Sequence, residues 1–184
     1  MTNDRLLFIE PPFISPQWDK KVTENFTLKE WYDSVMATSE QKEVLLQTGI
    51  PLDKRIPKVA QLVRDYTKQP VYIGSSYRTL EWDLSKGRTG TSQHIKGLAV
   101  DLNGKDVLQM IESSVNNRGE LYQELKALGV NYFRFYDWGV HLDLRPDEGL
   151  SYDPSYKKKV VKKQNDSILV FVFLFFLFLF KKFK

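Results

Sequence analysis

The sequence predicts an α+β fold in which helices pack on a small, largely antiparallel sheet. Three observations carry this prediction: helical patterns in the first half, short β-rich runs followed by two further helical patterns, and a closing hairpin pattern. With 184 residues, of which 42% are apolar, the chain has the size of one globular domain with an ordinary core. We divide it into an irregular lead-in (1–24), the domain (25–156) and a tail (157–184).

Two helical patterns occupy the first half of the domain. Thr27 followed by Glu30 is a capping-box pattern, and it predicts a helix that continues to a stop at Gly49. A stripe of apolar residues predicts a second helix over 57–66. Both patterns are typical of scaffold helices that bury one face against a sheet.

Short β-rich runs over 71–75 and 97–104 predict two strands. Between them, the segment 75–94 reads as a polar loop rich in Ser, Arg and Gly. Loops of this composition that leave a strand end often carry function, so we expect part of the site to lie there.

The second half of the domain alternates between helical and strand patterns. Helices are predicted over 105–117 and 120–128, and a glycine closes the second one. The runs 132–136 and 139–145 predict the two strands of a hairpin. This order of elements favours an antiparallel sheet over a parallel one.

The chain contains two histidines, His94 and His141, and each falls in a short motif. In the second hairpin strand, alternation puts His141 and Asp143 on the polar face, and Asp101 likewise lies opposite an apolar stripe in its own strand. Imidazole is the commonest metal ligand, and three protein ligands are typical of a catalytic zinc site, which keeps its fourth position for water or substrate. We therefore interpret His94, Asp101 and His141 as the ligands of one zinc ion.

Composition excludes several classes of function. The chain has no cysteine, which excludes thiolate metal sites, disulfides and cysteine nucleophiles. Residues 1–156 are mildly acidic, which argues against nucleic-acid binding. The N-terminus lacks the basic-then-apolar order of a secretory signal, so we expect no signal peptide.

The tail over 157–184 differs abruptly from the domain. It carries eight lysines and one acid around a run of thirteen apolar residues, Ile168 to Phe180. A helix of that length spans about 20 Å, short of the roughly 30 Å hydrocarbon core of a bilayer. Two interpretations stay open: contact with a membrane through 168–180, or a low-complexity terminus without a role in catalysis.

Several short motifs stand together in a recognisable order: Ser75-Ser76-Tyr77-Arg78-Thr79, then Ser92-Gln93-His94 with Gly97, Ala99 and Asp101, then His141-Leu142-Asp143. They resemble the M15 peptidases, which include zinc D-Ala-D-Ala carboxypeptidases and their phage-endolysin and hedgehog-like relatives. The similarity extends over 25–146 and includes the run 25–30 near the start of the domain. It implies a hedgehog/DD-peptidase-like fold and makes 25–156 an M15-like zinc peptidase domain.

The resemblance also implies an activity and residue roles. It implies hydrolysis of peptide bonds in bacterial peptidoglycan, of the D,D-carboxypeptidase or the endopeptidase (endolysin) type, with one Zn²⁺ held by the two histidines and the aspartate named above. Arg78 matches the arginine that steadies the substrate carboxylate or the developing oxyanion. Tyr77 and Ser92 match substrate-side positions, although the Ser92 hydroxyl also suits a role in shaping the loop.

The general base departs from the family pattern. Many members carry an acid three residues before the last histidine, and this chain has Trp138 there. Asp137, one residue further back, and Asp143, on the same face as His141, are both candidates for the base, and Asp143 can instead orient the His141 ring. The branch that this chain most resembles often lacks the upstream acid, so its absence does not imply inactivity.

Two other functions compete with the peptidase interpretation. One is a non-catalytic, zinc-containing domain that binds the cell wall or a partner; the other is a membrane-surface protein whose tail is the functional part. For the leading interpretation we expect peptidoglycan peptides as partners, no nucleic acid, action at the bacterial cell wall and a monomer. A phage or a bacterium would both fit as the source.

Overall fold

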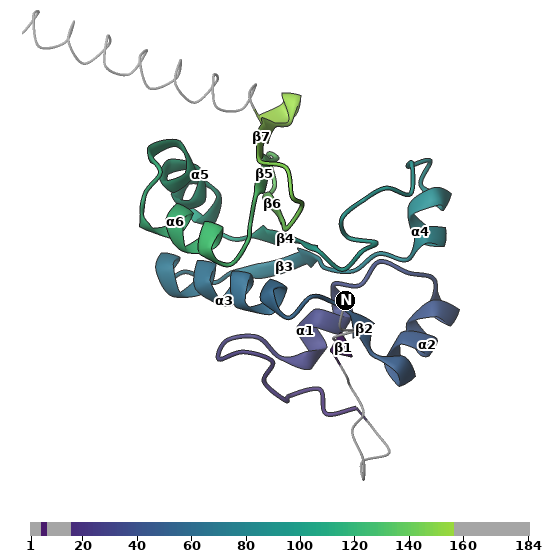
Figure 1. Ribbon diagram of the computed structural model, residues 1–184. Coiled ribbons are helices and arrows are strands. Elements are labelled where there is room, and N and C mark those ends of the chain that lie inside the picture. Colours follow the sequence, from purple (N-terminus) through teal and green to yellow (C-terminus); the bar gives the residue numbers. More distant parts are fainter. Residues whose placement is uncertain (1–4, 7–15, 157–184) are drawn as a thin grey trace, which may run out of the picture.

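The structure, a computed structural model, describes residues 5–6 and 16–156 (Figure 1). Most of the predicted lead-in and the whole of the tail over 157–184 lie outside the described residues, and with them the apolar run 168–180. Within the described part of the chain, no helix combines the length and the apolar character that crossing a bilayer requires.

A five-stranded sheet forms the centre of the fold, in the order β3-β4-β6-β5-β7. Neighbouring strands run antiparallel except β5 and β7, which pair in parallel. The fold is therefore α+β with a largely antiparallel sheet, as predicted. The strands are β3 (Tyr72–Ser75), β4 (Ala99–Asn103), β5 (Tyr132–Phe135), β6 (Val140–Asp143) and β7 (Gly149–Tyr152). Two short strands, β1 (Arg5–Leu6) and β2 (Ile50–Pro51), pair separately.

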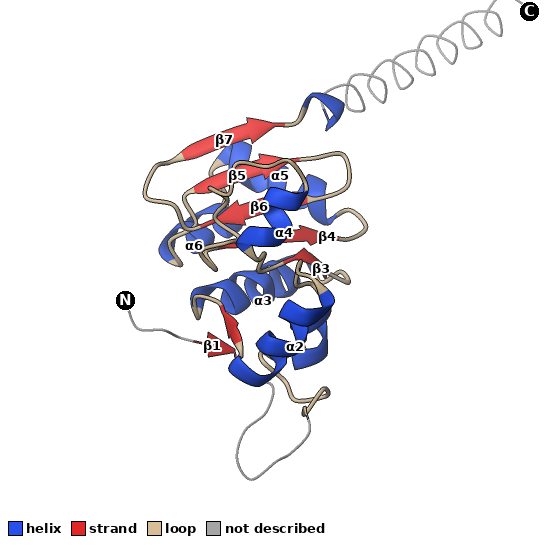
Figure 2. Ribbon diagram, turned by 90° about the vertical axis from the view of Figure 1, so that its right-hand side faces the viewer, coloured by secondary structure: helices blue, strands red, loops and turns tan. Residues whose placement is uncertain are grey.

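Three helices cover one face of this sheet, as Figures 1 and 2 show. They are α3 (Arg55–Thr67), α5 (Val107–Asn117) and α6 (Glu120–Ala127), which correspond to helices predicted from apolar periodicity. Core side chains from the strands, among them Leu102 and Leu142, are fully buried. Because side chains alternate along a strand, the neighbours of these leucines point to the opposite face, where polar groups gather.

The helix predicted from Thr27 to Gly49 is instead two helices, so that prediction was wrong. They are α1 (Leu28–Asp33) and α2 (Ser39–Thr48). The predicted capping box at Thr27 is present, but a second one forms at Thr38, whose side chain accepts from the Gln41 backbone. Between the helices, the Met36 backbone donates to the Tyr77 carbonyl and accepts from Thr79. This long-range pairing takes the place of helical hydrogen bonds and breaks the continuous pattern.

The segment 75–94 is also not the uniform loop that was predicted. It contains α4 (Leu80–Ser85), which lies over the sheet face opposite α3 (Figure 2). The Thr79 side chain accepts from the Trp82 backbone at its start, a local capping signal that was present in the sequence. Strand β7 was likewise not predicted, because its four residues gain their pairing only from contact with β5.

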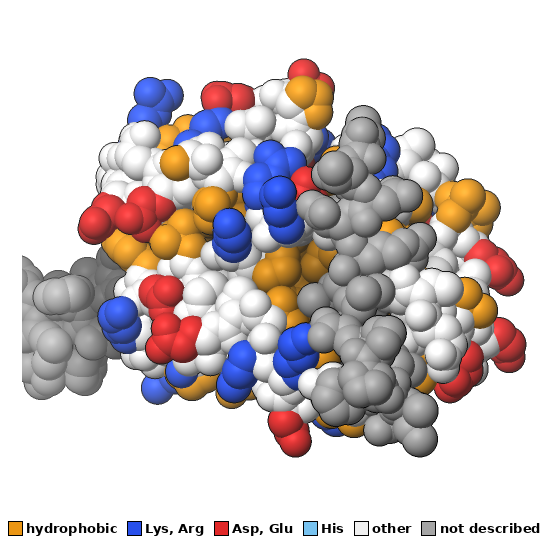
Figure 3. All heavy atoms as spheres, turned by 60° about the horizontal axis from the view of Figure 1, so that its bottom comes forward, with side chains coloured by type: hydrophobic (Ala, Val, Ile, Leu, Met, Phe, Trp, Pro, Cys, Tyr) orange, Lys and Arg blue, Asp and Glu red, His pale blue; other side chains and the backbone are white. Residues whose placement is uncertain are grey.

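The face at the bottom of Figure 1 is shown in Figure 3. On its described part, Lys and Arg side chains are interspersed with Asp and Glu, and hydrophobic side chains lie between them. A surface of mixed sign produces no concentrated field.

Candidate metal centre

The candidate site lies on the polar face of the sheet, between β4 and β6. Asp101 on β4 and His141 on β6 are direct cross-strand partners in the antiparallel register. Side chains of such a pair stand on the same face with their Cβ atoms about 5 Å apart. Both side chains are buried beneath the loop that precedes β4. The sheet register therefore brings together two residues that are 40 positions apart in the chain.

That loop supplies His94 through a tight turn. The Ser92 hydroxyl accepts a hydrogen bond from the His94 backbone at 3.3 Å, which supports the loop-shaping role expected as one alternative for Ser92. Gly97 ends the turn with φ +69°, and a Cβ atom there would lie 2.0 Å from the Pro51 carbonyl oxygen. Only glycine fits this position, so the close approach of the β2 backbone holds the loop and fixes the place of His94.

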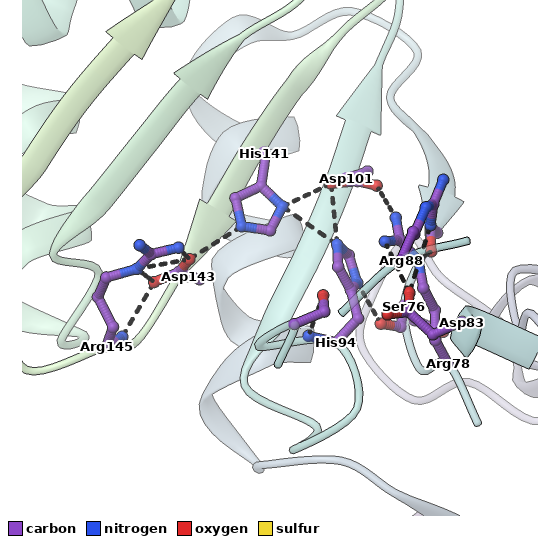
Figure 4. Close-up of polar contacts among 11 residues, drawn as sticks. Ser76, Arg78, Asp83, Arg88, His94, Asp101, His141, Asp143 and Arg145 are labelled. Carbon is purple, nitrogen blue, oxygen red and sulfur yellow. Dashed lines mark hydrogen bonds and ion pairs between the residues drawn. The ribbon is translucent and has the colours of Figure 1, made fainter. Parts of the chain in front are cut away.

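Three ligand atoms from these residues converge on one point (Figure 4). His94 Nε2 lies 3.1 Å from Asp101 Oδ1 and 3.1 Å from His141 Nδ1, and His141 Nδ1 lies 2.7 Å from Asp101 Oδ1. Tetrahedral ligands at about 2.0–2.1 Å from zinc are roughly 3.3 Å apart. An opening of a few tenths of an ångström therefore makes room for the ion, and the three predicted ligands can hold one.

The outer ring nitrogens determine where the histidine protons lie. His94 Nδ1 is 2.6 Å from the Ser76 carbonyl oxygen, which can only accept, so this nitrogen carries the proton. His141 Nε2 is 2.9 Å from Asp143 Oδ2, and it donates to this carboxylate in the same way. With both rings neutral, two nitrogen lone pairs and one carboxylate oxygen face one another. Such an arrangement is repulsive unless a cation or a proton lies between them, and it is the arrangement of a metal site.

Burial and charge shift the pKa values of the three groups in different directions. Burial lowers the pKa of His94, which keeps this ring neutral. Burial alone would raise the pKa of Asp101, but His94 and His141 hold it well below its usual value, so Asp101 is ionised. For His141, burial lowers the pKa, while hydrogen bonds to Asp101 and Asp143 outweigh it and raise the pKa. His141 is therefore the ring for which a proton competes best with a metal ion.

Asp143 lies on the outer side of the His141 ring, away from the three ligand atoms (Figure 4). It is fully buried and accepts hydrogen bonds from His141 and from both the backbone and the side chain of Arg145. Burial raises the pKa of Asp143, but these hydrogen bonds outweigh it and lower the pKa. This geometry favours the second of the two roles predicted for Asp143, orientation of the ring.

Arg78 contacts a metal ligand directly. Its Nη2 donates to Asp101 Oδ2 at 3.0 Å, and its Nε donates to the Ser75 hydroxyl at 3.3 Å. The guanidinium thus occupies one oxygen of Asp101 and leaves the other, Oδ1, for an ion. Arg78 was predicted to face the substrate; it does line the cavity above the site, but its hydrogen bonds go to the protein.

A buried carboxylate, Asp83, lies behind Arg78, and the sequence analysis did not predict its role. Asp83 on α4 is 1% exposed and lies 3.9 Å from Arg78 Nη1 and 3.4 Å from Arg88 Nη1. The Ser76 carbonyl that fixes His94 was missed too. No sequence pattern marks a backbone carbonyl, whereas Asp83 stands in the first turn of a helix whose cap was readable.

A polar cavity of about 310 Å³ opens above the three ligand atoms. Besides both histidines, its lining includes Arg78, Ser92, Gln93, Tyr132, Arg134, Tyr136 and Arg145. Tyr77 is not part of this lining and packs partly buried against the hydrophobic core. Asp137 is exposed in the β5–β6 turn and does not line the cavity either. The structure thus brings Arg78 and Ser92 to the ligands and leaves Tyr77 and Asp137 apart from them.

Comparison with known proteins agrees with this geometry. The sequence model of the family described as Peptidase M15 matches residues 25–142, which include the three ligands and Arg78. A search of the curated proteins found no match. The matched segment begins just before α1 and ends within β6, so it covers most of the described domain.

Proposed function

The chain belongs to the peptidase M15 family, and from this premise we propose that it is a zinc-dependent peptidase that hydrolyses peptide bonds in bacterial peptidoglycan. The bond cut would be of the D,D-carboxypeptidase or the endopeptidase (endolysin) type. The observation that carries the proposal is the convergence of ligand atoms from His94, Asp101 and His141, with the outer ring nitrogens directed at the Ser76 carbonyl and at Asp143. Such a donor set, made of nitrogen and oxygen only, suits zinc with an open fourth position.

The protein groups around the ion have separate tasks in this proposal. When bound, zinc polarises the scissile carbonyl and lowers the pKa of the attacking water. Asp143 orients the His141 ring, and Arg78 orients Asp101, so the ligand atoms keep their positions as charge develops. These contacts exist before substrate binds, which is the kind of preorganisation that lowers the cost of reaching the transition state.

Proton transfer and oxyanion stabilisation fall to the β5–β6 turn and its neighbours. We propose Asp137 or Asp143 as the proton acceptor: the Asp143 oxygens are occupied by His141 and Arg145, whereas Asp137 does not line the cavity. Tyr136 lines the cavity, and burial raises the pKa of its hydroxyl, so it stays protonated near neutral pH. It is able to donate a hydrogen bond to the developing oxyanion.

The test is metal-dependent release of amine ends from peptidoglycan. Purified full-length protein is incubated with cell-wall sacculi, with and without a chelator, and new amine ends and zinc content are measured together. We expect one zinc per chain, release that stops with chelator and returns with added zinc, and loss of both zinc and activity in His94→Ala. Stoichiometric zinc without new amine ends in the wild type would refute the peptidase.

A non-catalytic zinc domain that binds the cell wall is the second candidate, and one observation favours it. Trp138, which occupies the position of the family's acid, is 50% exposed and stacks on Tyr136 at 5.0 Å. An aromatic pair with one exposed ring beside a cleft suits binding as well as catalysis. Under this candidate, zinc-loaded protein would co-sediment with sacculi and release nothing.

The proposed activity also implies a place of action. We propose that the protein acts at the bacterial cell wall as a monomer, on peptidoglycan peptides and not on nucleic acid. Contact of the apolar run 168–180 with a membrane is part of the same proposal. Truncation after Tyr156 tests the tail: activity on soluble muropeptides is expected to persist.

A further inference from the structure

Arg134 stands in the same cross-strand row as the metal ligands. On β5 it pairs directly with His141 of β6, which in turn pairs with Asp101 of β4. Cross-strand partners share one face of the sheet with Cβ atoms about 5 Å apart. The Arg134 side chain therefore lies beside a metal ligand, and it lines the same cavity of about 310 Å³.

Two of the three arginines that line this cavity are occupied by the protein. Arg78 donates to Asp101 at 3.0 Å and to Ser75 at 3.3 Å. Arg145 donates to both oxygens of Asp143 through its side chain, and its guanidinium lies 3.6 Å from the centre of the Tyr132 ring. Arg78 holds the metal ligand Asp101, and Arg145 holds Asp143. Neither guanidinium is therefore well placed to turn toward a substrate.

Arg134 has unused donors. Its Nη2 makes a long contact of 3.4 Å with Asp153 Oδ2, and its guanidinium lies over the Tyr136 ring at 5.1 Å. Its Nε is buried and has no hydrogen-bond partner among the described residues. A guanidinium has five N–H donors, and a buried donor without a partner is costly unless a ligand satisfies it. With 40% of the side chain exposed, the group is accessible from the cavity.

We propose that Arg134 recognises a carboxylate of the substrate next to the scissile bond, and that the protein prefers peptides carrying one there. This inference rests on the proposed peptidase function. A planar guanidinium binds a carboxylate through two parallel hydrogen bonds, which a lysine cannot reproduce. Arg134 would then be a specificity-determining residue. Arg78 differs from it, because Arg78 holds the metal ligand Asp101.

The charge of the cleft also favours an anion. Arg78, Arg145 and Arg134 each contact an aspartate, so the three pairs are close to neutral by themselves. A bound divalent ion therefore leaves the cleft positive.

The carboxylate has two chemical sources, which peptides can distinguish. One is the α-carboxylate of a C-terminal residue that is released by hydrolysis. The other is an acidic side chain on the leaving side of an internal bond. Three N-acetylated peptides of equal length separate them: one ends in free D-Ala-D-Ala, one is its C-terminal amide, and one is an amide with glutamate on the leaving side.

The experiment compares wild type, Arg134→Gln, Arg134→Lys and Arg118→Gln on these peptides. Arg118→Gln is the matched control, because it removes the same charge from an exposed position at the end of α5, on the other face of the sheet. Zinc content and circular dichroism confirm that each variant is loaded and folded. A second readout is calorimetric binding of N-acetyl-D-alanine and of its amide to each zinc-loaded protein.

In the wild type, we expect kcat/KM to be higher for a carboxylate-bearing peptide than for the plain amide. That ratio should fall about 10- to 100-fold in Arg134→Gln and by less in Arg134→Lys, with no change in the control. Binding of the acid should weaken in parallel. A ratio and a binding constant unchanged in Arg134→Gln would overturn the inference. If the wild type cleaves none of the peptides, the peptidase proposal fails, and the binding comparison still decides the role of Arg134.

Discussion

Arg78 and Asp101 share a single hydrogen bond that assigns the two oxygens of one carboxylate to different tasks. Arg78 Nη2 holds Asp101 Oδ2 at 3.0 Å, and Oδ1 faces His94 and His141. The arginine thus supports the candidate metal site through Asp101. Burial lowers the pKa of Arg78, but a guanidinium remains charged near neutral pH, so the contact persists across the working range.

Replacing Arg78 by Gln should therefore weaken zinc binding. The Asp101 carboxylate would lose the donor that orients it, and loss of such a partner costs about 10- to 100-fold in metal affinity. Competition titration with a zinc chelator measures this affinity. Arg118→Gln is the charge-matched control, and an unchanged zinc affinity in Arg78→Gln would contradict the role.

Asp137 and Asp143 should differ in the kind of defect they cause. If Asp137 accepts the proton, Asp137→Asn lowers kcat on muropeptides about 100- to 10,000-fold at normal zinc content. Asp143→Asn is expected to weaken zinc binding about 10- to 100-fold, because His141 loses the carboxylate that orients it. Kinetics and metal analysis on the same preparations separate the two; an Asp137→Asn enzyme of full activity would assign the base elsewhere.

Zinc affinity should fall as the pH falls. Despite burial, hydrogen bonds to Asp101 and Asp143 raise the pKa of His141 above its ordinary value of about 6.5. In the metal-free protein the His141 ring therefore takes up a proton already above pH 6.5, and that proton must leave when zinc binds. Below this pKa, each pH unit should cost about tenfold in affinity. Titrations at pH 8, 7 and 6 measure the slope, and a flat profile would show that His141 does not ligate the metal.

Gly97→Ala should destabilise the fold more than Gly87→Ala. Both glycines have φ +69°, so alanine at either position carries the strain of a left-handed conformation, about 1–2 kcal/mol. At Gly97 the added Cβ atom also meets the Pro51 carbonyl at 2.0 Å, whereas nothing lies within 4 Å at Gly87. Urea unfolding should show a loss of roughly 3 kcal/mol or more for Gly97→Ala. Equal losses in the two variants would mean that the loop before β4 adjusts without cost.

Much of the fold could be predicted from the sequence, because local sequence patterns determine those elements. Apolar periodicity predicted α3, α5 and α6, and alternation placed His141 and Asp143 on the polar face of β6. The break between α1 and α2 was not readable, because the Met36 backbone pairs with the segment that contains Tyr77. Strand β7 was not predictable either, because it forms through its pairing with β5.

By itself, the sequence determined the ligand types, two imidazoles and a carboxylate without any thiol, and the strand faces that carry Asp101 and His141. Only the tertiary structure decided that Ser76 and Asp143 hold the ring protons on the outer side, that Arg78 holds the ligand Asp101, and that Arg134 lies beside His141 with donors to spare. The physical reason is one of range. Side-chain alternation depends on neighbours in the chain, whereas the contacts of His94 with Ser76 and His141, 18 and 47 residues away, depend on the register of the sheet and the path of a loop.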